Sequence, residues 1–139
     1  MTRLNTSAAI AMGILQKKKS VMDKWRIDYL INENIDYLAK NLFDADAIMS
    51  ILKIDARTAF DRLFYLVSQN MLNAYLVWMK DGAQINSITF KEGKFDLNDF
   101  GGEEHPPLDE LYVKFKVSKE YKETMDEWKK VKKTRTKKK

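Results

Sequence analysis

The spacing of the apolar residues changes from a helical to an alternating period within residues 46–91 of this chain. Between residues 56 and 71 the apolar positions recur every three or four residues, which is the spacing of a helix with one buried face. Residues 72–79 and 85–90 instead alternate, and they are rich in the β-branched and aromatic side chains that suit half-buried strands. This change of period favours helices packed beside a β-hairpin.

A shorter helix is predicted just before the longer one. It spans residues 47–52, and Asp46 is placed where an N-cap carboxylate accepts the first free backbone N–H groups. Residues 53–55 form the predicted turn, in which Asp55 is placed to cap the helix that follows. A second turn at residues 80–82 joins the two predicted strands.

The order of short helix, tight turn, longer helix and hairpin resembles the winged helix-turn-helix superfamily. The resemblance implies an α+β fold, a winged-helix-like domain with N-terminal helices, a small antiparallel sheet with the hairpin as its wing, and a C-terminal helix with a basic tail. In the DNA-binding members the second helix of the turn enters the major groove, and its outward side chains meet base edges. On this sequence the resemblance gives that role to Arg57, Thr58, Arg62, Tyr65 and Gln69.

Asp61 stands in the middle of this predicted reading face. Phosphate repels a carboxylate, and winged helices also serve as protein-binding modules, so the fold alone does not decide the function. Contact with DNA and contact with a protein both remain open for this helix.

The positive charge of the chain is concentrated near its ends. The formal net charge is +5, but residues 129–139 hold eight basic residues and no acidic one, which leaves residues 1–128 with a net charge of −3. We predict one domain over residues 1–128 followed by a disordered basic tail, because the tail has too few apolar residues to bury. Its basic residues are Lys129, Lys130, Lys132, Lys133, Arg135, Lys137, Lys138 and Lys139.

The N-terminal part of the chain is predicted to be helical. The apolar run at residues 8–15 is followed by Lys17, Lys18 and Lys19, and it is shorter than the ~20 residues that cross a bilayer. We expect no membrane segment and no export signal, and the lysines either form a solvated helix end or contact phosphate. An apolar stripe predicts a further helix over residues 20–43, and we expect Trp25 and Tyr29 at the margin of the core; the stripe contains Ile27, Leu30, Ile31, Ile35, Leu38 and Leu42.

Beyond the hairpin, a turn at residues 92–94 predicts a short strand over residues 95–97. Residues 98–107 contain paired glycines and paired prolines and predict a loop without helix, in which His105 is an ordinary loop residue. Residues 111–117 alternate between apolar and basic or aromatic side chains, the pattern of a half-buried strand, and a final helix is predicted to begin near Ser118.

The sequence lacks the residue patterns of common catalytic sites. It has no cysteine, which excludes disulfides and thiolate zinc sites and fits the reducing cytoplasm. It contains no glycine-rich phosphate loop, serine elbow or histidine pair. The paired carboxylates Asp44 with Asp46 and Glu103 with Glu104 are explained by helix caps and a solvated loop. We therefore expect no enzymatic activity, no cofactor and no metal.

The first functional hypothesis is a nucleic-acid-binding accessory protein or transcription regulator. The basic tail would attach to DNA phosphates, and the helix over residues 56–69 with the wing would set the orientation. The alternative is a protein adaptor on a large machine such as RNA polymerase, because the composition of the chain resembles small early proteins of T4-like phages, some of which bind host RNA polymerase. A third possibility is that the lysine tail folds onto the acidic residues 96–110.

Overall fold

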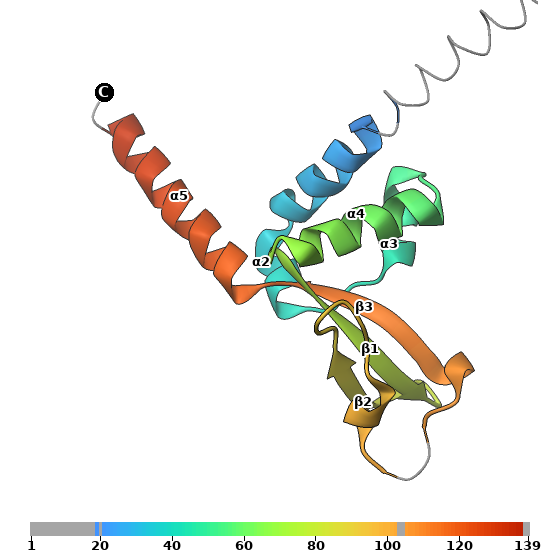
Figure 1. Ribbon diagram of the computed structural model, residues 1–139. Helices are drawn as coiled ribbons and strands as arrows, with labels where there is room; N and C mark the ends of the chain where they lie inside the picture. Colours follow the sequence, from blue (N-terminus) through green and yellow to red (C-terminus); the bar gives the residue numbers. More distant parts are fainter. Residues whose placement is uncertain (1–18, 20, 103–104, 138–139) are drawn as a thin grey trace, which may run out of the picture.

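The computed structural model describes residues 19, 21–102 and 105–137 (Figure 1). The described chain is α+β, with helices gathered at the end of a three-stranded antiparallel sheet where β1 begins and β3 ends. The other end of the sheet projects away from the helices, and α5 leaves the domain on its own (Figure 1). None of the helices in this described part is both long and apolar enough to cross a membrane.

The predicted helix over residues 20–43 is divided in two and ends early. A helix over residues 21–33 stops at Asn34, whose backbone is non-helical and whose side-chain Nδ2 donates to the Leu30 carbonyl at 2.9 Å. The helix α2 follows over Ile35–Lys40. Phe43 was predicted to be helical, but it pairs with Phe115 of β3 through backbone hydrogen bonds of 2.9 and 2.7 Å. A short extended segment therefore joins the N-terminal helices to the sheet.

The predicted order of a short helix, a turn and a longer helix is confirmed, with one correction at its start. The helix α3 spans Ala45–Leu52, and its N-cap is Asp44, whose Oδ1 accepts the Ala47 N–H at 2.9 Å. The prediction that Asp46 caps this helix was wrong, because Asp46 lies in its first turn. The helix α4 spans Ala56–Ser68 with Asp55 at the N-cap position, as predicted, although the Asp55 side chain makes no capping hydrogen bond.

The sheet has the strand order β2-β1-β3. The predicted hairpin is confirmed as β1 (Leu72–Lys80) and β2 (Ala83–Thr89), joined at Asp81 and Gly82, which both have positive φ as tight hairpin turns require. The strand predicted over residues 111–117 is also confirmed, as β3 (Leu111–Val117), and it pairs with the other side of β1. Since β3 also bridges to Phe43, it lies between β1 and the segment that joins α2 to α3.

The segment between β2 and β3 differs from the prediction. Lys91 and Lys94 form a β-bridge around the predicted turn, but residues 95–97 form no strand. Asp96 accepts the Asn98 N–H at 3.0 Å and caps the short 3-10 helix η1 (Leu97–Phe100), so the expectation of a loop without helix was wrong here. A second 3-10 helix, η2 (Leu108–Glu110), leads into β3.

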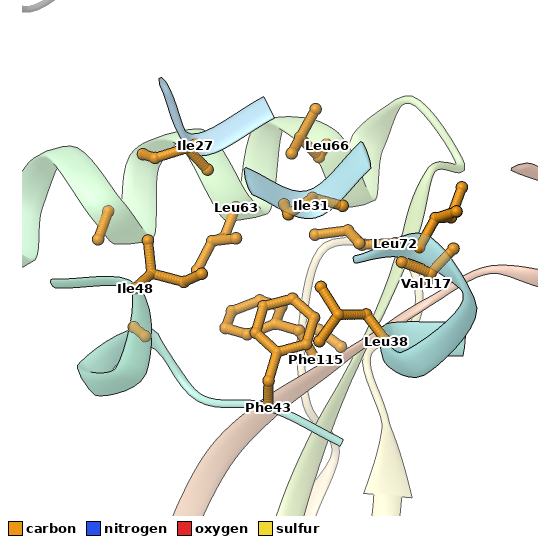
Figure 2. Close-up of a cluster of buried hydrophobic side chains, with 14 of the residues drawn as sticks. Ile27, Ile31, Leu38, Phe43, Ile48, Leu63, Leu66, Leu72, Phe115 and Val117 are labelled. Carbon is orange, nitrogen blue, oxygen red and sulfur yellow. The ribbon is translucent and has the colours of Figure 1, made fainter. Parts of the chain in front are cut away.

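The core lies where the helices meet the start of β1 and the end of β3. Figure 2 shows Phe115 beside Phe43 at the centre of this cluster, with ring centroids 5.9 Å apart. Ala59, Leu63 and Leu66 of α4 are buried on the predicted face. The helix over residues 21–33 contributes Ile27 and Ile31, and the sheet contributes Leu72, Ala74 and Val117. The periodicities of the sequence thus placed most of the core correctly.

Candidate nucleic-acid interface

The helix α5 (Lys119–Lys137) is fixed to the domain at its first turn. The buried Ser118 hydroxyl donates to the Asn70 carbonyl at 2.7 Å and accepts the Tyr121 N–H at 3.1 Å. The Ser118 N–H also donates to the Met71 carbonyl at 3.0 Å. Ser118 therefore caps α5 and ties its start to the connection between α4 and β1.

Two further contacts hold α5 against the N-terminal helices. The Tyr121 hydroxyl donates to the Asn32 side chain, and burial raises the pKa of Tyr121. The Lys122 ammonium lies 2.6 Å from Asp126 and 2.9 Å from Asp36. These hydrogen bonds raise the pKa of Lys122, and the bond from Lys122 lowers the pKa of Asp36. Beyond these contacts α5 runs away from the domain (Figure 1).

The basic residues predicted to lie in a disordered tail continue α5 in the structure. The helix runs to Lys137 and so includes six of the eight, whereas Lys138 and Lys139 lie outside the described residues. The helix can continue because residues 119–137 contain no glycine or proline and Lys and Arg are good helix formers. Cations also suit the C-terminal end of a helix dipole. The six residues are Lys129, Lys130, Lys132, Lys133, Arg135 and Lys137.

The predicted reading face of α4 is only partly available. The Arg62 guanidinium makes two hydrogen bonds to Asp28 of the helix over residues 21–33, at 3.0 and 2.5 Å, and only 19% of its side chain is exposed. The bond to Asp28 raises the pKa of Arg62, and the guanidinium also lies 4.7 Å from the centre of the Tyr65 ring. Arg62 thus belongs to a contact between two helices, and Tyr65 of the same helix, which is 48% exposed, lies over its guanidinium.

The other predicted residues of α4 are placed closer to solvent. Arg57 is 90% exposed and lies 3.9 Å from the exposed Asp61, which partly neutralises it. Gln69 is exposed as the C-cap of α4, and Thr58 is half-buried. Of the predicted N-terminal lysines, Lys19 is exposed, while Lys17 and Lys18 lie outside the described residues.

The third hypothesis required the basic end of α5 to meet the acidic residues 96–110. In the structure the two lie at different ends of the molecule (Figure 1). Trp78 of β1 packs against Phe100 with ring centroids 6.2 Å apart, and its indole N–H donates to Glu110 at 3.4 Å. His105 lies in the predicted loop and contacts Asn98 at 3.2 Å.

Sequence reasoning missed an apolar surface on the N-terminal helices. Trp25 and Tyr29 were expected at the core margin, but they are 62% and 67% exposed. With Met22 they border a hollow of about 430 Å³, which reaches Leu30 and Leu52. The sequence did contain a sign of this surface, because apolar residues occupy a wider arc of the helix over residues 21–33 than one core can bury.

A second apolar hollow lies between α2 and α3. Its volume is about 400 Å³, and Leu30 belongs to both hollows. Among its lining side chains, Tyr37, Leu42 and Ile51 are exposed. Within the described residues, no group of three or more histidine, cysteine, aspartate or glutamate side chains is arranged to hold a metal ion.

Comparison with known protein families, with curated proteins and with solved structures finds no match to this chain.

Proposed function

We propose that this protein is a non-enzymatic nucleic-acid-binding accessory protein or transcription regulator of the cytoplasm, and that α5 is its phosphate-binding arm. One observation carries the proposal. Six basic residues stand on the part of α5 that projects from the domain, and no acidic residue follows Glu127. A helix of this kind presents positive charge to a polyanion away from the net negative domain.

The length of the arm fits a duplex backbone. Residues 129–137 cover about 12 Å of helix axis. Over that length duplex DNA carries ~7 phosphate charges, so several contacts can form at once. Because lysine contacts phosphate rather than base edges, the binding is largely independent of sequence.

The winged-helix-like arrangement supports the proposal through orientation rather than base readout. In this proposal α3 and α4 serve as the helix-turn-helix, and the β1–β2 hairpin serves as the wing. Arg62 is held by Asp28, and Arg57 lies beside Asp61. We therefore assign α4 a docking role, and we assign the main share of the affinity to α5.

The salt dependence of binding tests the proposal. Affinity for a random 20-base-pair duplex is measured by fluorescence anisotropy between 50 and 300 mM salt. A plot of the logarithm of the association constant against the logarithm of the salt concentration should have a slope of about −4, since each phosphate contact contributes about −0.9 to it. In the test variant, four lysines of α5 are replaced by Gln, which is also a good helix former: Lys129, Lys130, Lys132 and Lys133. The slope for this variant should be less steep by ~2–4.

A matched control removes the same charge elsewhere. In the control variant the exposed Lys40, Lys80, Lys91 and Lys94 are replaced by Gln. Its slope should stay close to that of the wild type, because these residues do not lie on the arm. Equal losses in the two variants would show that net charge, rather than α5, governs binding, and the proposal would fail.

A second candidate function is a protein adaptor on a large assembly such as RNA polymerase. The apolar hollow between α2 and α3 favours it, since exposed Tyr37, Leu42 and Ile51 offer an anchor pocket to an apolar segment of a partner. Capture from nuclease-treated lysate should retain a partner with the wild type and lose it with Tyr37→Glu and Ile51→Glu. Loss of every partner on nuclease treatment favours nucleic-acid binding instead.

A further inference from the structure

The three-stranded sheet has an inner face against the core and an outer face that points away from this core. On the inner face, the opposed pairs Leu72–Val117 and Ala74–Phe115 are buried among the helices. Successive side chains of a strand point to opposite sides of a sheet. The residues that alternate with these pairs therefore form the outer face.

Two tyrosines and two lysines lie close together on the outer face. Tyr75 of β1 is directly opposite Lys114 of β3, and Tyr112 of β3 is opposite Val77. The two tyrosines are thus diagonal neighbours, with Cα atoms about 8 Å apart. Lys116 follows Lys114 on the same side of β3. Aromatic rings and ammonium groups are therefore interleaved over two neighbouring strands.

The side chains of this group are not engaged by the rest of the domain. Tyr112 is 51% exposed, and Tyr75, Lys114 and Lys116 are half-buried. Within the described residues, none of these four side chains makes a hydrogen bond, an ion pair or a ring contact. The three strands contain no aspartate or glutamate, so the positive charge of the two lysines is not balanced within the sheet.

We propose that the outer face is a platform for a single strand of nucleic acid, on which Tyr75 and Tyr112 stack against two unpaired bases. Lys114 and Lys116 contact the phosphates of the same strand. Proteins bind single strands by combining aromatic rings, on which successive bases stack, with positive charge along the backbone. The bases of a duplex are stacked on one another and do not offer their faces, so the platform selects unpaired nucleotides.

An acidic hollow beside the platform limits the path of the strand. Tyr112 and Lys114 border this hollow, which has a volume of about 580 Å³. Its lining carries two lysines, Lys80 and Lys114, against four carboxylates, so it is net negative: Asp44, Asp81, Asp109 and Glu110. Because like charges repel, the phosphates lie away from the hollow, over Lys114 and Lys116. Since Lys116 stands just before α5, this path leads towards the start of α5.

The inference deepens the proposed function and rests on its claim that the ligand is a nucleic acid, but it uses no residue of α5. The variant of α5 with four lysines replaced should weaken the binding of single strands and of duplex alike. Loss of a tyrosine from the platform should weaken only the binding of single strands. Failure of one claim can therefore be distinguished from failure of the other.

Tyrosine variants test the stacking. Fluorescence anisotropy measures affinity for an oligothymidylate and an oligouridylate of about 12 nucleotides, a length within the usual site size, and for a duplex of the same length. Tyr112→Ala and Tyr75→Leu should each weaken the binding of single strands roughly tenfold and leave the affinity for duplex unchanged. Tyr112→Phe keeps an aromatic ring and should bind like the wild type. The matched control is Tyr29→Ala, at an exposed tyrosine of the helix over residues 21–33, which should change neither affinity.

The results that would overturn the platform are equally specific. A wild type that binds neither single strand would overturn it. The same holds if Tyr112→Ala binds the single strands as tightly as the wild type, or if it weakens the binding of duplex by the same factor. A loss of affinity for either oligonucleotide alone supports the platform and shows which sugar the bound strand carries.

The salt dependence tests the two lysines. The double variant Lys114→Gln with Lys116→Gln should make the slope for single strands less steep by about 1.4, since each phosphate contact of a single strand contributes about −0.7. The slope for duplex should stay that of the wild type. Equal changes for duplex and single strand would show that the lysines act only through net charge, and their role in the platform would be refuted.

Discussion

The ion pair between Arg62 and Asp28 provides the sharpest test of the structure, because the sequence suggested a different role for Arg62. The pair joins α4 to the helix over residues 21–33 through two hydrogen bonds, and its side chains are only 19% and 25% exposed. We predict that Arg62→Met and Asp28→Asn each destabilise the fold. A residue that served only to contact DNA would leave stability unchanged.

The size of the effect follows from the burial of the pair. Exposed ion pairs contribute ~0–1 kcal/mol, and breaking a buried pair costs ~3–5 kcal/mol. The bidentate but partly exposed pair should lie between them, at about 1.5–2.5 kcal/mol for each single variant, and in Arg62→Met this figure includes ~0.5–1 kcal/mol for the lost stacking of Arg62 on Tyr65. For a chain of this length the melting temperature should fall by ~5–10 °C.

A double-mutant cycle by urea denaturation separates the pair from its surroundings. The double variant should cost ~1–2 kcal/mol less than the sum of the two single variants, because the interaction can be lost only once. DNA affinity per folded molecule should be unchanged in Arg62→Met. Additive effects within ~0.3 kcal/mol, or a loss of DNA affinity without a loss of stability, would refute the assignment of Arg62 to the helix contact.

Three further predictions concern the core and the attachment of α5. Phe115→Ala should cost ~3–5 kcal/mol by urea denaturation, because it empties the centre of the core, while Tyr112→Ala at an exposed position should cost less than ~0.5 kcal/mol. Ser118→Ala should cost ~1–2 kcal/mol and speed hydrogen exchange in the first turn of α5, since it removes the cap and leaves the Asn70 carbonyl with one partner fewer; unchanged exchange would contradict this. The pKa of Asp36 is lowered in the fold, so its contribution to stability is present above the ordinary aspartate pKa of about 3.9 and is lost as the pH falls below that value. The pKa of Lys122 is raised in the fold, so its contribution to stability is lost only above the ordinary lysine pKa of about 10.4. The protection factors of the amides in the first two turns of α5, which correct for the intrinsic pH dependence of exchange, should therefore fall at both extremes of pH, and Lys122→Met should reduce both falls.

Local sequence signals predicted the elements whose formation depends on neighbouring residues. The period of three to four placed the buried face of α4, and the alternating period placed β1, β2 and β3. The N-cap of α3 was misplaced because Asp44 and Asp46 are two carboxylates of equal capping ability, and the pairing of Phe43 with β3 decides where the helix can begin. Such a choice depends on a strand about 70 residues later in the chain.

The features that the sequence could not predict depend on distant partners. The strand order requires knowing that β3 pairs with both β1 and Phe43, and no local pattern encodes this. Arg62 was predicted to be available for contact with DNA, because its partner Asp28 lies on another helix and 34 residues earlier in the chain. Trp25 and Tyr29 were predicted at the core margin, whereas both are exposed. The periodicity of a sequence shows which faces of a helix are apolar, but it does not show how many of those faces the core covers.

The bridge between Phe43 and Phe115 also has a consequence for how the protein folds during its synthesis on the ribosome. The helices within residues 21–68 share their core with Phe115 and Val117 of β3, and β3 is among the last parts to be synthesised. Until residue 117 has emerged, the four described helices of residues 21–68 lack the Phe115 side chain at the centre of their core, and their apolar surfaces are open to chaperones or to wrong partners. Completion of the fold must therefore wait for the closing of a loop that spans half of the chain, and such non-local pairings form slowly.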